Sequence, residues 1–340
     1  MQPYWNPIER RPRAGWRVLI HFATWILTYS LVQIATGSPL TALIYDRVPE
    51  LTDLTDRIVA QAVTVILFML LTWVVTRYVD RRPLAQLGLQ MDRRWWQDFG
   101  FGLLLGAGAM SAVFGVEYWA GWIEIDGRFF AHVTTLPFAV AILGPVMVFV
   151  VIGITEEVLF RGHQLRNLAE GLNLGAWHPR YAVLSSWLLS SAFFGLFHVF
   201  NPYSDWISTL NLAILGLMFG LGFILTGRLG LPIGLHITWN LFMGNVFGFP
   251  VSGNDFTSAS VFIIRQHGPS AWTGGPFGPE AGLIGILAIL VTSWAVVWWV
   301  RKHYGRIELD LNLARYEAGI GLTPGAELPT GDAGTAAENE

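Results

Sequence analysis

Long apolar runs separated by short polar segments dominate the chain. In hydrocarbon, every backbone N–H and C=O group must be hydrogen-bonded within its own segment, so a helix needs about 20 mostly apolar residues to cross a membrane. The runs that meet this requirement predict an all-α fold, a polytopic membrane bundle of about eight transmembrane helices. The predicted spans are 18–36, 58–79, 99–120, 138–160, 181–200, 206–226, 231–248 and 281–300.

Composition supports the prediction of a membrane protein. Of the 340 residues, 53% are hydrophobic and 13% are charged, and the mean hydropathy is +0.47. Soluble domains carry about 25% charged residues. The formal net charge of −3 gives no reason to expect a nucleic-acid partner. The absence of cysteine excludes disulfides, thiolate metal ligands and cysteine nucleophiles.

Basic residues concentrate in the N-terminus and in alternate connections. Because basic loops are retained in the cytoplasm, both termini are predicted to be cytoplasmic, which requires an even number of spans. The basic segments are 1–17, 80–95, 161–180 and 301–306, whereas 37–57, 121–137 and 249–279 are poor in Arg and Lys. Residues 249–279 are rich in Gly, Pro, Ser and Asn and are predicted to form a long extracytoplasmic loop. The first apolar run lacks a small-residue cleavage site, so it is interpreted as a retained span and not as a secretory signal.

The predicted fourth span ends in charged residues that are costly in lipid. Residues 133–155 contain no charged side chain, and Glu156, Glu157 and Arg161 follow within six positions. An ionised carboxylate near a helix centre costs about 2.5–3.5 kcal/mol on insertion scales, so it usually faces a partner or a polar cavity. Glu157 and Arg161 have the i, i+4 spacing of an ion pair. Glu156 points about 100° away from Glu157, which makes it the candidate reactive carboxylate. The alternative is that these residues mark the cytoplasmic end of the span.

Two further apolar segments carry polar groups. His198 ends the fifth predicted span, and the seventh carries His236 and Asn240 at i, i+4, on the same side of one helix. A single histidine in a membrane helix is more often a packed, hydrogen-bonded residue than a catalyst. Three segments that each contribute Glu or His to an uncharged interior favour a shared site.

Together these residues supply the groups that acyl hydrolysis requires. A carboxylate can act as general base, an imidazole can hold and deprotonate water, and an amide can donate to an oxyanion. No serine or cysteine nucleophile with a recognisable turn is present. The hydroxyls of Ser190, Ser191 and Thr238 are more typical of helix packing.

Three motifs give the chain a family resemblance. Glu156 to Arg161 matches EExxxR, Phe194 to His198 matches FxxxH, and His236 to Asn240 matches HxxxN. In this order, on successive membrane segments, they resemble the CPBP family, the CAAX protease and bacteriocin-processing (Abi) intramembrane peptidases. The stretch Arg82 to Leu89 is similar to the segment that often lies upstream in that family. The resemblance extends over about residues 80–250.

The resemblance implies an intramembrane endopeptidase that cleaves an unidentified protein or peptide near the cytoplasmic membrane face. It implies that Glu156, assisted by His198, activates water, that His236 and Asn240 stabilise the oxyanion, and that Glu157 and Arg161 form a supporting pair. It implies an integral protein of the plasma (inner) membrane of a prokaryote. The expected organisation is an N-terminal tail with two spans (1–79), a peptidase core (80–305) and a largely disordered cytoplasmic tail (306–340).

The resemblance leaves two catalytic types open, because the family has been described both as metal-dependent and as glutamate-based. His236 and Asn240 do not form the HExxH pair of a zinc peptidase, and asparagine is a poor zinc ligand. The residues therefore favour a site without cofactor, and a divalent metal such as zinc stays an alternative.

Two other function classes fit parts of the pattern. Buried Glu and His residues could relay protons or bind a cation in a transporter, although the sequence shows no inverted repeat. A non-catalytic scaffold would keep the helices, but loss of motif residues would then be expected. The expected partners are a protein or peptide substrate and membrane lipids. The substrate, any role of prenylated proteins and the oligomeric state cannot be derived from the sequence.

Overall fold

The computed structural model describes residues 3–36, 49–132, 134, 136–174 and 178–316, and most of them are helical. The helices are α1 (Ala14–Thr36), α3 (Pro49–Val74), α4 (Arg93–Trp119), α5 (Phe138–Ala141), α6 (Leu143–Glu157), α7 (Arg166–Leu172), α8 (Pro179–Phe197), α9 (Trp206–Thr226), α10 (Gly230–Leu241), α11 (Ser270–Thr273) and α12 (Leu283–Tyr304). The strands are β1 (Trp5–Asn6), β2 (Arg11–Pro12), β3 (Ile123–Ala131) and β4 (Ala259–Gln266). The predicted all-α fold is confirmed only as a mostly helical one, because the described residues also form four strands in two antiparallel pairs. The predicted disordered tail lies largely outside the described residues.

The helix lengths change the predicted count of spans. By length and composition, five helical segments in the described part of the chain could cross a membrane: Ile58–Val79, Arg93–Trp119, Phe138–Leu172, Trp206–Thr226 and Leu283–Tyr304. The predicted spans 18–36 and 181–200 correspond to α1 and α8, which are not in this set. Helix α10 has 12 residues, about 18 Å at 1.5 Å per residue, whereas the hydrocarbon core is about 30 Å thick. The count of eight spans is therefore not confirmed.

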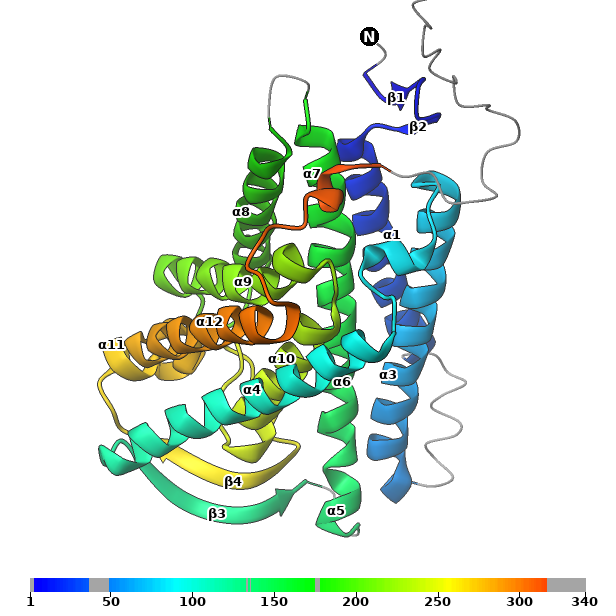
Figure 1. Cartoon of the computed structure of the whole chain (residues 1–340). Coiled ribbons are helices and arrows are strands. Elements are labelled where there is room, and N and C mark those ends of the chain that lie inside the picture. The colour runs from blue at the N-terminus through cyan, green and yellow to red at the C-terminus, as the bar shows by residue number, and fades with distance from the viewer. Residues whose placement is uncertain (1–2, 37–48, 133, 135, 175–177, 317–340) are drawn as a thin grey trace, which may run out of the picture.

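Helix α6 is the central element of the bundle. Figure 1 shows α1 and α3 running alongside α6, while α4, α9 and α12 are steeply inclined to it. A π-helical segment, Val158–Leu165, continues α6 directly into α7, so the candidate span reaches Leu172 and not residue 160 as predicted. The EExxxR residues consequently lie within a long helical run and not at its end.

Helix α9 is capped at both ends, and a sharp turn after its last residue leads into α10. At the start of α9, Asp205 accepts the Ser208 backbone N–H (2.7 Å) and Ser208 Oγ accepts the Asp205 N–H (2.8 Å), which forms a capping box. Gly227, with φ of 65°, ends α9 in the left-handed conformation that glycine adopts without strain. Helix α10 begins three residues later, so the HxxxN motif packs directly against the preceding helix.

A β-ribbon closes one end of the bundle (Figure 1). Strands β3 and β4 pair antiparallel, with Glu124 opposite Arg265, and Arg265 also bonds Asp126 at 2.8 Å. The sequence predicted only a loop over 249–279, so the interpretation missed β4. Its partner strand lies more than 120 residues earlier in the chain, and no short turn links the two strands to signal a hairpin.

The described ends of the chain meet at the opposite end of the bundle. Glu170 Oε2 on α7 accepts hydrogen bonds from Arg11 (2.9 Å), Arg17 (3.0 Å) and Arg82 (2.7 Å). The Arg11 guanidinium lies 3.4 Å from the centre of the Tyr316 ring. This ionic cluster joins the N-terminal arm, α1 and the C-terminal segment to α7. That this end faces the cytoplasm stays a prediction from the basic residues.

Glycines bring α10 unusually close to α4. A Cβ atom at Gly106 of α4 would lie 2.5 Å from the Leu235 carbonyl oxygen and 2.7 Å from the Trp239 amide nitrogen. Gly230 and Gly234 of α10 face the α4 backbone in the same way. Small residues allow such close backbone approach in membrane helices. The position of the HxxxN motif therefore depends on backbone contact between α4 and α10.

This packing predicts different effects for two neighbouring glycine substitutions in α4. Gly106→Ala is expected to destabilise the protein by about 1–3 kcal/mol, because the added methyl forces the helices apart. Gly108→Ala is the matched control, since no atom lies within 4 Å of its Cβ position. It is expected to leave stability unchanged or to raise it by up to about 1 kcal/mol, the helix preference of alanine over glycine. Thermal unfolding of both variants in detergent checks this, and equal melting temperatures would contradict it.

Candidate active site

Glu157 is a fully buried carboxylate held by two partners. Its Oε1 accepts a hydrogen bond from Arg161 Nη1 at 2.9 Å and one from His236 Nδ1 at 2.8 Å. Arg161 also donates from Nη2 to the Gly216 carbonyl oxygen of α9 at 3.0 Å. The ion pair expected from the i, i+4 spacing is therefore present, and it joins α6, α9 and α10. Because Glu157 and Arg161 are buried, they do not mark a solvated helix end.

His236 lies between the two glutamates of the motif. Since an ionised carboxylate only accepts hydrogen bonds, the bond to Glu157 places a hydrogen on His236 Nδ1 and leaves Nε2 facing Glu156. The distance from Nε2 to Glu156 Oε2 is 4.0 Å. The imidazole stacks on the Phe219 ring, with 4.4 Å between ring centroids. The ring is thus fixed both by a hydrogen bond and by stacking.

Glu156 differs from Glu157 in what surrounds it. Its side chain is 15% exposed, whereas that of Glu157 is fully buried. The Oε2 of each carboxylate has no hydrogen-bond partner among the described residues. Glu156 lines a cavity of about 290 Å³ between α1, α3 and α6. The cavity is lined by Trp25, Thr28, Tyr29, Gln61, Thr64, Phe68, Val148, Val151, Ile152, Thr155, Glu156 and Phe256. The carboxylate therefore has a free acceptor oxygen close to an imidazole and to a cavity.

His198 reaches the same region through Phe194. Its Nδ1 donates to the Phe194 carbonyl oxygen at 2.7 Å, because a carbonyl can only accept, and its Nε2 is left free. The Phe194 ring packs against the His198 ring at 4.8 Å and against the His236 ring at 6.1 Å between centroids. The Arg161 guanidinium lies 4.5 Å from the centre of the same ring. The phenylalanine of FxxxH thus contacts residues of all three motifs.

Asn240 is buried one turn after His236 on α10. The spacing places its amide on the same side of the helix as the imidazole. The six motif residues therefore come from three neighbouring parts of the bundle, α6 with its π-helical continuation, the end of α8, and α10. Glu156, Glu157, Arg161 and His236 form one contiguous cluster, His198 joins it through Phe194, and for Asn240 the placement rests on burial and helical spacing.

The donor set gives no support to a metal centre. No group of three or more His, Asp or Glu side chains is placed to hold a metal ion within the described ranges. One nitrogen of His236 is committed to Glu157, and one of His198 to a backbone carbonyl. We therefore derive no catalytic step through a metal.

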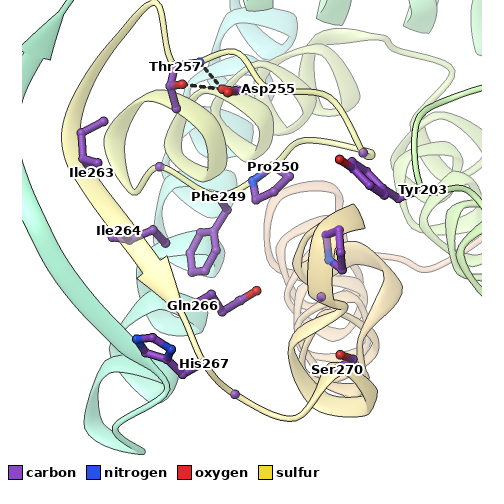
Figure 2. A pocket seen from close by; sticks show the side chains of 15 residues that line it. Tyr203, Phe249, Pro250, Asp255, Thr257, Ile263, Ile264, Gln266, His267 and Ser270 are labelled. Carbon is purple, nitrogen blue, oxygen red and sulfur yellow. Dashed lines mark hydrogen bonds between the residues drawn. The ribbon is translucent and has the colours of Figure 1, made fainter.

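A second cavity lies away from this cluster. It measures about 630 Å³ and lies beside the ribbon, where Phe249, Ile264 and His267 are among the side chains that line it (Figure 2). None of its described lining residues belongs to the three motifs. The ionisable groups of the motifs therefore select the smaller cavity beside Glu156.

One buried carboxylate that contacts α10 was missed by sequence reasoning. Glu280 is buried and accepts a hydrogen bond from Trp239 Nε1 at 3.1 Å, next to Asn240 in the chain. It follows a Gly- and Pro-rich segment that the sequence predicted to be an extracytoplasmic loop. A glutamate in a polar loop is expected to be solvated, and only its burial among distant segments reveals it.

The fold and the cluster define a helical membrane protein with paired glutamates and two histidines in its interior. Residues 137–242 match the family described as Type II CAAX prenyl endopeptidase Rce1-like. The resemblance inferred from the motifs is thereby confirmed over this segment, which contains all six motif residues. With the five candidate spans, the match supports an integral membrane protein of peptidase type. Comparison with curated proteins and with solved structures gave no match.

The buried pair predicts a large effect of breaking it. Arg161→Met leaves the Glu157 carboxylate without its guanidinium partner and is expected to cost about 3–5 kcal/mol of stability. Adding Glu157→Gln should restore part of that loss, because the uncompensated charge is removed. Denaturant titration in detergent measures both free energies of unfolding.

The exposed ion pair of Arg265 with Asp126 is the control. Its arginine side chain is 60% exposed, so Arg265→Met should cost less than about 1 kcal/mol. Equal losses for Arg161→Met and Arg265→Met would contradict a stabilising role for the buried pair.

Proposed function

We propose that this protein is an intramembrane endopeptidase in which the Glu156 carboxylate activates water. The observation that carries the proposal is the unpartnered Oε2 of Glu156, 4.0 Å from His236 Nε2 and at the wall of a cavity. A general base must have a free acceptor oxygen within reach of the proton that it removes. Glu157 also has an unpartnered Oε2 in the described structure, but its side chain is fully buried, it does not line the cavity, and its charge is compensated by Arg161 and His236.

In the proposed site, the charges of the four ionisable groups cancel. Glu156 and Glu157 carry two negative charges, and Arg161 with a protonated His236 carries two positive ones. In this state His236 donates from Nδ1 to Glu157 and presents Nε2–H toward the reacting carbonyl. Fixed charges of this kind need no reorganisation when the oxyanion forms, which is the main advantage of a preorganised site.

The proposed reaction has two steps. In the first, Glu156 takes a proton from water while the water oxygen bonds to the carbonyl carbon of the peptide, and the resulting oxyanion is stabilised by His236 and Asn240. The free Nε2 of His198 helps to hold the water. In the second, Glu156 returns the proton to the amide nitrogen, the C–N bond breaks, and an acid and an amine leave.

The location of the cluster supports cleavage within the membrane. Glu156 lies in the candidate span Phe138–Leu172. The arginines that bind Glu170 lie on and around α7, at the far end of that span. If this end faces the cytoplasm, as the basic residues predict, the substrate is cut near the cytoplasmic face. The substrate is a protein or peptide whose identity the cavity does not define.

Glu156→Gln is the decisive substitution. It keeps the shape of the side chain and removes the base, so cleavage should fall by at least about 10²-fold while folding and membrane insertion stay normal. A proteomic comparison of protein termini in cells that carry wild type or the variant identifies the substrate.

Glu308→Gln, in an exposed ion pair with Arg306, serves as the matched control and should leave the termini unchanged. A Glu156→Gln protein that is folded, inserted and as active as wild type on a proven substrate would remove the proposal.

A further inference from the structure

Glu280 is a buried carboxylate in the segment between β4 and α12, outside the residues that match the family. We propose that Glu280 is a positioning residue of the active site, which holds the HxxxN helix and the end of α8 in register. The inference rests on the proposed function, because the groups it would position are those of the proposed peptidase.

The first contact fixes α10. Glu280 Oε1 accepts the indole N–H of Trp239 at 3.1 Å. Trp239 is fully buried and lies between His236 and Asn240, three residues after one and directly before the other. Its ring also meets the Phe219 ring edge to face, the same phenylalanine on which His236 stacks. The hydrogen bond therefore restrains rotation of α10 about its own axis.

The second contact fixes the chain that follows α8. Glu280 Oε2 accepts both the backbone N–H of Ser252 (2.9 Å) and its Oγ hydroxyl (2.7 Å). The Ser252 carbonyl oxygen in turn accepts Asn201 Nδ2 at 2.8 Å, and the Asn201 backbone N–H donates to the His198 carbonyl oxygen at 3.0 Å. A chain of four residues thus leads from the carboxylate to a motif histidine.

The backbone conformation of Ser252 indicates that surrounding contacts hold this segment in place. Its φ is 47°, in the left-handed region that residues with a side chain rarely adopt. In this conformation its N–H and its hydroxyl both reach the same carboxylate oxygen. A disfavoured backbone conformation persists only where surrounding contacts hold it, and such positions cluster at functional sites. Here Glu280 supplies two of those contacts.

The hydrogen bonds also indicate the charge of Glu280. Three donors, the Trp239 indole and the two groups of Ser252, point at its two oxygens, and a protonated carboxyl would place a fourth hydrogen among them. The geometry therefore fits the ionised form. Burial raises the pKa of Glu280, while hydrogen bonds from Ser252 and the charge of His198 act in the opposite direction.

The groups that contact Glu280 come from three elements. They are Asn211 of α9, which donates to the Glu280 carbonyl oxygen, Trp239 of α10 and Ser252 of the loop, and none of them titrates in the neutral range. A titration of Trp239 that is lost in Glu280→Gln therefore reports on the carboxylate.

An experiment that needs no substrate tests the hydrogen bond between Glu280 and Trp239. The full-length protein is labelled with 5-fluorotryptophan, and the ¹⁹F signal of Trp239, assigned by its absence in Trp239→Phe, is followed against pH in detergent micelles. The signal should titrate with Glu280 in wild type and should not titrate in Glu280→Gln. In Ser252→Ala the midpoint should move to higher pH, because the carboxylate loses the hydroxyl hydrogen bond that favours its ionised form.

The Ser252→Ala result decides the inference even if Glu280→Gln fails to fold. A Trp239 signal whose midpoint is the same in wild type and Ser252→Ala would overturn it. This outcome is independent of whether Glu156→Gln changes any protein terminus, so failure of the inference and failure of the proposed function can be told apart.

Activity provides a second readout once the comparison of termini has supplied a cleavable peptide. Glu280→Gln and Trp239→Phe should each lower kcat about tenfold or more with KM unchanged, since small misplacements of reacting groups are costly. The double variant should be no worse than either single one, because both break the same bond.

Glu117→Gln is the matched control for this second readout. Glu117 is also buried and accepts one side-chain hydrogen bond, from Gln266 at 2.7 Å, but it contacts no motif residue in the described structure. Its kcat should equal that of wild type. A kcat for Glu280→Gln equal to that of the control would contradict the inference.

Discussion

The architecture of the site depends on one requirement, the compensation of the Glu157 carboxylate inside the bundle. An ionised group without a partner in this setting would cost several kcal/mol. Arg161 and His236 meet the requirement together, and in doing so they bring α6 and α10 to a fixed separation. Because one imidazole nitrogen is used for compensation, the other is aimed at Glu156. Charge neutralisation and orientation of the site are thus consequences of the same pair of contacts.

Backbone packing gives this electrostatic arrangement its precision. Helix α10 has only 12 residues. Its position is fixed by glycines that allow it to pack directly on the α4 backbone. Phe194 and Phe219 fill the remaining space around the imidazoles with flat, stiff rings. Few rotamers are left to the polar side chains in such surroundings, which is the condition for a preorganised site.

The sequence revealed the chemistry of the site better than its boundaries. Charged residues in an apolar run identified Glu156, Glu157 and Arg161, and the i, i+4 rule gave the ion pair, because both arguments use only local spacing. The length of the fourth span was misjudged, since the basic segment 161–180, which begins with Arg161, suggested a helix end where a π-helical segment continues. Burial of the π-helical segment comes from α1, α8 and α9, which local spacing cannot show.

Long-range pairing explains the other differences. Strand β4 exists because β3 offers it a partner, and Glu280 is buried because Trp239 and Ser252 supply donors from other parts of the chain. Neither partner can be identified from residues close in sequence. The same holds for α1 and α8, which pack against α3, α7 and α9.

The cavity beside Glu156 and the cluster of ionisable residues are built largely from different stretches of the chain. Six of its twelve lining residues belong to α1 and α3, which precede the segment that matches the family, whereas the glutamates and histidines lie within that segment. Substitutions in the two leading helices can therefore reshape the space next to the carboxylate without touching the cluster. In the proposed peptidase, selectivity and reactivity are therefore encoded in different stretches of the gene, so one can be altered, by evolution or by engineering, while the other is kept.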